Sequence, residues 1–202
     1  MASSKLQIWN LALSHLNIGK EVQGENESSQ EAAACRRFYD FALSATLRDF
    51  EWPFATAFVT LALVAEHPTS EWIYAYRYPS DCVKFRRILS GTRNDTAQSK
   101  ISYRIARDTQ GRMIYTDRAE AEAEYTLLET DTSRYSDDFV IALSLRLASY
   151  ICPRLTAGDP FKLRQTTLQL YAFEINTAQA NAASEERQEQ EPESELLRSR
   201  EE

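Results

Sequence analysis

The sequence has few of the residues on which most enzyme and metal sites depend. Its 202 residues include only two histidines, three cysteines and five glycines. It contains no Gly-rich phosphate loop, no nucleophile-elbow motif and no CxxC pair, so the signatures of nucleotide-binding, serine-hydrolase and zinc proteins are missing. Cys35, Cys82 and Cys152 are odd in number and far apart in sequence, and we expect them to be small buried apolar residues rather than disulfide partners.

The two histidines do not form a recognisable constellation. His15 lies in the first expected helix and His67 in a polar stretch. A histidine that acts as a base, or as a metal ligand, needs partners at a suitable spacing, and neither one has them. We therefore expect no catalytic residue, no metal site and no cofactor.

Long hydrophobic runs are also missing. The longest candidate, residues 54–65, is shorter than the roughly 20 residues that a membrane-spanning helix needs, and Thr56 and Thr60 interrupt it. The first residues lead directly into an amphipathic segment, without the apolar block of a secretory signal. We expect a soluble protein that is made in the cytosol and has no membrane partner.

The residues that are present favour a packed domain. Hydrophobic residues make up 43% of the chain and aromatic residues 11%, which is enough to bury a core. The net charge of −7 disfavours general affinity for nucleic acid, because such affinity requires a cationic surface.

Helical periodicity occurs at both ends of the chain. Apolar residues at three- and four-residue spacing form one stripe in each segment, and Pro53, Pro153 and Pro160 stand near the expected ends. Pro153 should kink or end the third helix, whereas Pro160 suits the first position of the fourth. The patterns predict helices at about residues 4–18, 28–52, 136–157 and 160–183.

Capping residues mark several of these ends. Ser3 and Ser4 can cap the first helix, and Gly19 suits the left-handed position that ends it. Ser28 stands three residues before Glu31, which is the spacing of a capping box. Ser136 can cap the third helix, where two aspartates follow it and complement the helix dipole.

The middle of the chain alternates with a period of two. Such alternation of aromatic and β-branched residues predicts strands with one buried face. We expect a β-rich insertion at about 57–130, with a more buried strand at 57–64 and hairpin turns at Gly91 and Gly111. The alternating residues are Trp72, Tyr74, Tyr76 and Tyr78; Val83 and Phe85; Ile101, Tyr103 and Ile105; and Ala123, Tyr125 and Leu127.

These patterns predict one α+β domain that is mainly helical. None of the four helices can bury its stripe alone, so we expect helices from both chain ends to form a bundle, with an antiparallel β-rich segment inserted between them. This domain would span residues 1–183. Residues 184–202 hold eight glutamates and no aromatic residue, so this acidic tail is either disordered or ordered by a partner.

Charge is segregated within the β-rich segment. Residues 77–112 carry nine basic and three acidic side chains, and residues 113–138 carry eight acidic and two basic ones. Either the opposite charges pair across neighbouring strands, or opposite faces of the subunit carry opposite signs and favour head-to-tail association. The candidate subunit-interface residues are Arg77, Lys84, Arg86, Arg87, Arg104 and Arg107.

Carboxylate pairs are the remaining possibility for catalysis. Glycoside hydrolysis needs two carboxyl groups about 5–10 Å apart, and Asp49 with Glu51, or Asp81, could provide them. With 30 acidic residues in the chain, chance pairs are plentiful, and no pair stands out. We interpret these residues as caps and solvated surface charges.

Taken in order, several short segments resemble the head-to-tail adaptor family of short-tailed bacteriophages, also called tail tubular protein A. The resemblance covers residues 5–183, without the acidic tail, and Cys152–Pro153 stands where an unbroken helix would be expected. The matching segments are Ile8–Trp9–Asn10–Leu11–Ala12–Leu13, Leu16–Asn17–Ile18–Gly19, Glu31–Ala32 with Cys35, Tyr39–Asp40 with Leu43, Trp52–Pro53–Phe54–Ala55, Tyr76–Arg77–Tyr78–Pro79–Ser80–Asp81–Cys82, Leu147–Ala148 with Ile151, and Leu155–Thr156–Ala157–Gly158–Asp159.

The resemblance implies a structural virion protein at the head–tail junction, assembled in the host cytoplasm. It implies a ring, usually of twelve copies, that joins the capsid portal to the tail nozzle and lets DNA pass through its hole without sequence-specific binding. The matching residues would be structural. We expect Trp52 and Phe54 to be core anchors beside a helix end, with Pro53 between them. We expect Pro79 to end the strand that contains Tyr78, Asp81 to accept backbone N–H bonds in the turn, and Cys82 to fill a small buried gap.

Two expectations remain beside the adaptor ring. Leu196 and Leu197, the apolar residues of the acidic tail, are candidates for docking on the portal, and the tail could equally be a solubilising extension. The alternative function is a tail-associated peptidoglycan hydrolase that uses a carboxylate pair.

Overall fold

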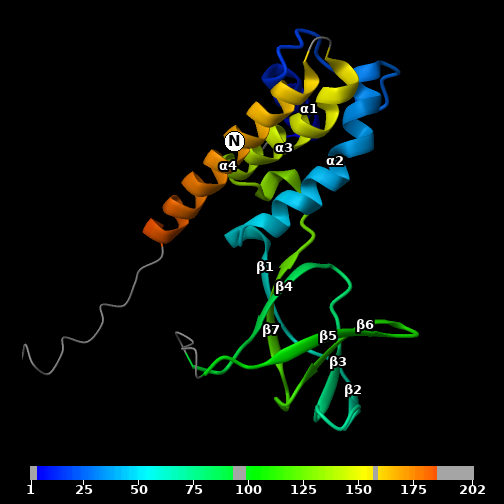
Figure 1. The fold of residues 1–202 in the computed structure, drawn as a ribbon, viewed down its shortest axis with the longest axis vertical. Coiled ribbons are helices and arrows are strands. Elements are labelled where there is room, and N and C mark those ends of the chain that lie inside the picture. The colour runs from blue at the N-terminus through cyan, green and yellow to red at the C-terminus, as the bar shows by residue number, and fades with distance from the viewer. Residues whose placement is uncertain (1–3, 93–98, 157–158, 186–202) are drawn as a thin grey trace, which may run out of the picture.

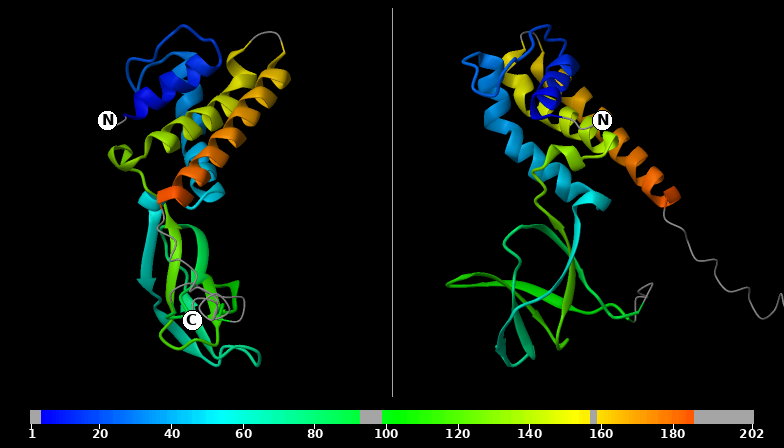
Figure 2. Two further views of the ribbon diagram at one scale, coloured as in Figure 1. Left: turned by 90° about the vertical axis from the view of Figure 1, so that its left-hand side faces the viewer. Right: turned by 180° about the vertical axis from the view of Figure 1, so that it is seen from behind.

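The computed structural model describes residues 4–92, 99–156 and 159–185 of the chain (Figure 1). These residues form an α+β fold in which two helices precede seven strands and two further helices follow them. Figures 1 and 2 show the helices together in one lobe and the strands in a second lobe below it. The expected α+β class and the order of the elements are therefore confirmed. Ser3, Gly158, Leu196 and Leu197 lie outside the described residues.

The helices share one hydrophobic core, which we call the helical lobe. Trp9, Leu13, Leu47, Leu147 and Ile151 come from three different helices, and each is at most 1% exposed. The fourth helix adds its own buried stripe to the same core, including the predicted Tyr171, Ile175 and Ala178. The helices are α1 (Lys5–His15), α2 (Gln30–Asp49), α3 (Asp137–Leu155) and α4 (Pro160–Glu185).

Helix α1 begins as predicted and ends earlier. The Ser4 hydroxyl accepts a hydrogen bond from the Gln7 backbone N–H at 3.2 Å, and the Gln7 side chain accepts one from the Ser4 N–H at 2.8 Å. The left-handed residue after the helix is Asn17, with φ 57°, and the prediction of Gly19 for this position is wrong. Asparagine tolerates this conformation better than most residues, which is why the glycine is not required there.

Helix α2 shows a similar shift at both ends. Its N-cap is Ser29, whose hydroxyl accepts from the Ala32 N–H, so the predicted capping box of Ser28 and Glu31 is wrong. The Glu31 carboxylate instead pairs with the Lys20 ammonium at 2.9 Å. The helix ends at Asp49 rather than near Trp52, and Phe50 already has an extended backbone.

The prolines of the last two helices act differently from each other. Ser136 caps α3 as predicted, but Pro153 lies inside this helix, which continues to Leu155. Proline lacks the backbone N–H that would bond to the preceding turn. Near the end of a helix this loss is tolerated, so α3 continues for two residues beyond Pro153. Asp159 caps α4, accepting from the Lys162 N–H at 3.0 Å, and Pro160 takes the first helical position as predicted.

The seven strands form two antiparallel sheets, which together make up the β-lobe. One sheet has the order β1-β7-β4 and the other has the order β2-β3-β6-β5. Gly111, with φ 141°, lies at the tight β5–β6 hairpin that the sequence predicts. The strands are β1 (Thr56–Thr60), β2 (Leu63–Glu66), β3 (Tyr74–Arg77), β4 (Cys82–Ile88), β5 (Tyr103–Asp108), β6 (Gly111–Thr116) and β7 (Glu122–Leu127).

A second hydrophobic core lies between the two sheets. It contains Tyr76, Phe85, Ile88 and Ile114, each at most 6% exposed. Phe85 and Ile88 are three residues apart and still share this core, because the pairing of β4 with β7 shifts register between Phe85 and Arg87. A bulge of this kind adds one residue to a strand and breaks the period of two.

Three predictions for the β-rich segment need correction. Among the described strands no hairpin forms at Gly91, because β4 and β5, the strands on either side of it, belong to different sheets. Strand β7 is buried on both faces rather than one, since consecutive residues from Ala123 to Thr126 are all buried. Residues 57–64 do not form one buried strand. They are divided between β1 and β2, which belong to different sheets, and most of their side chains are exposed.

The position of the α2 cap can be tested directly. We expect Ser29→Ala to lower the free energy of unfolding by about 1 kcal/mol, because the Ala32 N–H loses its acceptor. Ser28→Ala is the matched control and should change it by less than about 0.5 kcal/mol. Urea unfolding of both variants measures the difference, and a larger effect at Ser28 would show that the cap is misplaced.

Candidate assembly surfaces

The residues around Trp52 form an aromatic cluster at the end of α2. The Trp52 indole N–H donates to the Thr46 carbonyl oxygen at 2.9 Å, and the ring is 2% exposed. Edge-to-face contacts link it to Phe50 and to Phe139 of α3, each with centroids 4.9 Å apart. Phe54 contacts the same Phe139 ring. This cluster fastens the segment that leaves the helical lobe, as expected for a core anchor.

The turn between β3 and β4 has a different bonding pattern from the predicted one. The Pro79 carbonyl accepts from the Cys82 N–H at 3.3 Å, and the half-buried Cys82 thiol contacts the Tyr78 hydroxyl at 3.1 Å. The Asp81 carboxylate accepts from the Tyr125 hydroxyl at 3.1 Å, not from backbone N–H groups of the turn. Burial, followed by the charge of Asp81, raises the pKa of Tyr125 to about 12.

Two of the candidate interface cations bind the C-terminal end of α2. The Arg86 guanidinium donates to the carbonyl oxygens of Phe50 at 2.6 Å and Leu47 at 3.4 Å, and also to the Thr126 hydroxyl at 2.8 Å. The Lys84 ammonium donates to the Arg48 carbonyl oxygen at 3.0 Å. Cations are favoured at this end of a helix because its last carbonyls lack partners and carry partial negative charge. Strand β4 is therefore attached to the helical lobe through its side chains.

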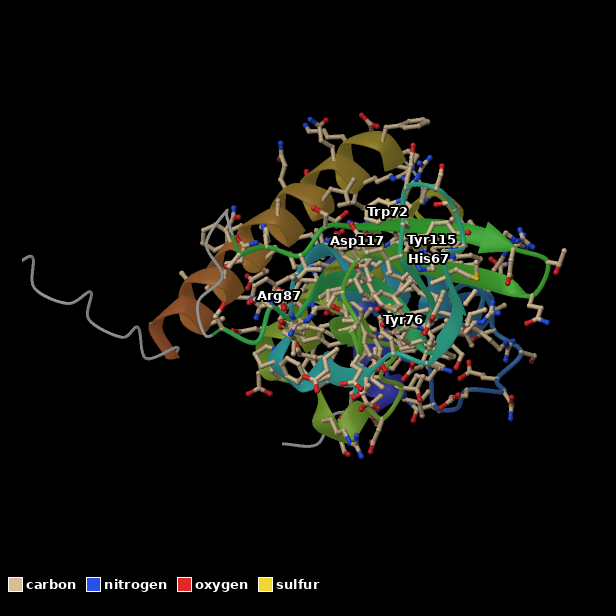
Figure 3. The ribbon with its side chains drawn as sticks, turned by 90° about the horizontal axis from the view of Figure 1, so that it is seen from below. His67, Trp72, Tyr76, Arg87, Tyr115 and Asp117 are labelled. Atoms are coloured by element: carbon tan, nitrogen blue, oxygen red, sulfur yellow. The ribbon has the colours of Figure 1, made fainter. Side chains whose placement is uncertain are left out.

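Two further candidates form ion pairs inside the β-lobe. Arg77 pairs with Asp108 at 3.2 Å, and Arg87 of β4 pairs with the buried Glu124 of β7. Arg87 and Glu124 are direct register partners on neighbouring strands. This pair follows the cross-strand interpretation of the charge segregation. In Figure 3 Arg87 lies well away from His67, which is on the β2–β3 side of the lobe.

The last two candidates, Arg104 and Arg107, lie exposed on β5. The Arg104 guanidinium is 3.9 Å from the Glu71 carboxylate, and the two side chains are 68% and 73% exposed. Ion pairs of this kind contribute little to stability. Of the six candidates, these two therefore point outward, and the interface role remains a prediction.

A carboxyl pair does occur, but with a partner that the sequence did not suggest. Burial and a hydrogen bond to Glu124 raise the pKa of Glu51 above its ordinary value, and the charge of Glu124 adds to this effect. Arg86 and Arg87 act in the opposite direction. Asp49 is separate from the pair, because its carboxylate accepts from the Tyr171 hydroxyl at 2.7 Å and contacts Arg146 at 3.2 Å.

His15 and all three cysteines are at least partly buried, whereas His67 is exposed. His15 contacts the Ser144 hydroxyl at 3.0 Å, and burial lowers its pKa. Cys35 and Cys152 are buried, and burial raises the pKa of Cys35 to about 12, which keeps its thiol protonated. Among the described residues no group of three or more His, Cys, Asp and Glu side chains is arranged to hold a metal ion.

Large apolar side chains are exposed at several places, and two regions hold several of them each. One is the outer side of α4, where Phe161 is 80% and Phe173 is 66% exposed, next to a shallow hollow of ≈ 390 Å³ lined by this helix alone. The other consists of β1 and β2, with Phe58 at 64% and Leu63 at 51%. Within the described part of the chain, no helix is both long and apolar enough to cross a membrane. Apolar area of this kind is typical of surfaces that bind proteins.

Sequence reasoning placed the aromatic anchor correctly and missed the function of Arg86. No periodicity or motif signals that an arginine of a strand will cap a helix more than thirty residues earlier, because the contact depends on how the lobes pack. The exposed edge at β1 and β2 was also missed, although a long run without charges was visible there.

No protein-family model matches this chain, and no protein of curated function matches it at a significant level.

The contact between the lobes can be tested at Arg86. We expect Arg86→Met to lower the free energy of unfolding by about 1–3 kcal/mol, because carbonyls at the end of α2 and the Thr126 hydroxyl lose a charged donor. Lys84→Met, which removes one exposed contact, is the control and should cost less than about 1 kcal/mol. Chemical unfolding measures both, and equal losses would contradict a special role of Arg86.

The Glu51–Glu124 contact predicts a pH effect with a definite sign. Because the pKa of Glu51 is raised in the folded state, its stabilising contribution is complete below the ordinary value of 4.5 and is lost as the pH rises through the raised value. Glu51→Gln keeps a donor toward Glu124 at every pH. The free energy of unfolding of the variant, minus that of the natural chain, should therefore be larger at pH 7 than at pH 4, as measured by urea unfolding at both pH values. A difference that is smaller at pH 7 than at pH 4 would contradict the contact.

Proposed function

We propose that this chain is a structural subunit that binds other protein subunits, and that it forms the adaptor ring between the portal and the tail nozzle of a short-tailed bacteriophage. The observation that carries the proposal is how the charged and aromatic groups are used. Arg77, Lys84, Arg86 and Arg87 all make contacts within the chain, Arg104 and Arg107 are exposed on β5, and large apolar side chains are exposed on strands and on α4. A surface of this kind suits binding to proteins better than chemistry on a small molecule.

The two lobes suit a ring subunit. Helices from both ends of the chain share one core, and the β-lobe is attached to them through the Trp52 cluster and Arg86. Side-by-side copies of such a helical lobe can close a ring, as twelve copies would, while the β-lobe provides a second layer of contacts. Ring closure needs two different, complementary surfaces on each copy.

Passage of DNA favours a channel wall without exposed cations, because arginines and lysines bind phosphates. Arg77 and Arg87 are paired with carboxylates and Lys84 and Arg86 bind α2, which reduces the positive charge that these four side chains would show to such a wall. In this proposal the basic segment, including the exposed Arg104 and Arg107, faces protein. The acidic tail, with Leu196 and Leu197, would dock on the portal. The ring would be assembled in the host cytoplasm and would remain in the virion.

The alternative is a tail-associated peptidoglycan hydrolase. Retaining glycosidases hold their two carboxyl groups about 5 Å apart, and inverting ones hold them further apart, so that the sugar carbon or a water molecule fits between them. Glu51 and Glu124 are hydrogen-bonded to each other, and Asp81 is occupied by the Tyr125 hydroxyl. These contacts favour the assembly role over hydrolysis.

The test is to mix the purified chain with isolated portal and to image the product. We expect a ring beneath the portal with as many copies as the portal symmetry accepts, whether the chain alone is a monomer or an oligomer. Removing residues 184–202 should weaken portal binding by at least about tenfold if the tail docks there. Clearing of peptidoglycan by the purified chain, lost in Glu51→Gln and accompanied by no portal binding, would refute the proposal.

A further inference from the structure

An uncharged segment runs along one side of the β-lobe. Residues 55–65 contain no charged residue, no proline and no glycine over eleven positions. They form β1 and β2, and apolar side chains of both strands are exposed, with Phe58 at 64%, Leu63 at 51% and Val64 at 43%. Segments with this composition pair readily with other strands, and proteins normally protect them with charges or proline.

Both strands are sheet edges. Strand β1 is the edge of the β1-β7-β4 sheet, and β2 is the edge of the β2-β3-β6-β5 sheet. Within the described residues, each of them pairs with one neighbour, so one row of backbone N–H and C=O groups of each strand faces away from its sheet. Such a row can accept a further strand by β-augmentation.

The opposite edges of the two sheets differ. In the first sheet the opposite edge is β4, which is held against α2 by Lys84 and Arg86. In the second sheet the opposite edge is β5. Among the described residues, no side chain of β5 binds the helical lobe in the way that Lys84 and Arg86 do. Strand β5 carries exposed Ile105, Arg104 and Arg107. The second sheet is therefore the one that can continue at both edges.

The two open edges of the second sheet complement each other. Strand β2 presents exposed Leu63 and Val64 and ends at Glu66. Strand β5 presents exposed Ile105, 45% accessible, between Arg104 and Arg107. An apolar residue can face an apolar residue across this contact while an arginine faces the glutamate, which is a favourable cross-strand combination.

We propose that β2 of one copy pairs with β5 of the next copy, so that the β2-β3-β6-β5 sheet continues from subunit to subunit. The inference rests on the self-association in the proposed function and assigns it to two named edges. The occupant is a second copy because one chain carries both halves of the contact on opposite edges of one sheet. Pairing of β5 with β5 would bring arginines against arginines, so the contact is head-to-tail, as a ring requires.

The experiment uses the full-length chain with a lysine placed at the centre of either edge. Val64→Lys blocks β2 and Ile105→Lys blocks β5, and both positions are exposed, so the fold should tolerate them. Phe173→Lys is the matched control, because Phe173 is also exposed but lies on α4. Circular dichroism and thermal unfolding verify that each variant folds like the natural chain, and sedimentation velocity from micromolar to millimolar concentrations measures association.

We expect the natural chain and Phe173→Lys to associate, and each edge variant to associate at least about tenfold more weakly. A mixture of the two edge variants should give dimers and nothing larger, because each variant keeps the edge that the other one lacks. This result is specific for a head-to-tail contact, since pairing of β2 with β2 would be lost in Val64→Lys alone and would leave Ile105→Lys unaffected.

Two outcomes would overturn the inference. One is a natural chain that remains monomeric at every concentration tested. The other is association that Val64→Lys and Ile105→Lys leave unchanged. In the second case the copies assemble through other surfaces, so the edge contact fails while the proposed adaptor function stands. Failure of the chain to bind any portal, with the edge contact intact, would refute the adaptor function alone.

Discussion

The attachment of the β-lobe to the end of helix α2 is the constraint on which the rest of the structure depends. Helix α2 ends with carbonyl oxygens that have no partner in the helix, and Arg86 of β4 donates to two of them. The buried Trp52 ring packs beside them against Phe139 of α3. Hydrogen bonds to a charged donor are stronger than neutral ones, and the buried aromatic rings keep water away from the helical side of the contact. Without this attachment the chain would have two lobes joined by linkers alone.

This constraint also determines which surfaces remain available. Among the described residues, the outer strand β4 of the first sheet is held near α2 by its side chains, whereas neither outer strand of the second sheet is. The internal pairs of Arg77 and Arg87 further reduce the charge that the β-lobe shows to a partner. Two strand edges of the β-lobe are exposed: β2, which is apolar up to the exposed Glu66 at its end, and β5, which carries Arg104 and Arg107. The proposed contact between copies follows from the way the charges are used inside each copy.

The pKa shifts of the described residues have structural causes. Burial raises the pKa values of Cys35 and Tyr125 to about 12, so neither group ionises under ordinary conditions. Glu51 is different, because burial and then a hydrogen bond to a second carboxyl group, Glu124, raise its pKa at the boundary between the lobes. That contact makes the boundary sensitive to pH.

The sequence by itself determined the elements whose signals are local. The stripes of α1 to α4, the caps at Ser4 and Ser136, Pro160 at the start of α4 and the glycine of the β5–β6 hairpin each depend on a few neighbouring residues, and each was predictable. Boundaries were less certain, since Ser29 rather than Ser28 caps α2. Only the tertiary structure decided that residues 57–64 divide between two exposed edges, that β7 is buried on both faces, that Arg86 binds α2 and that Glu51 meets Glu124. These features depend on contacts between segments far apart in the chain, and local residue patterns carry no information about which distant segments will meet.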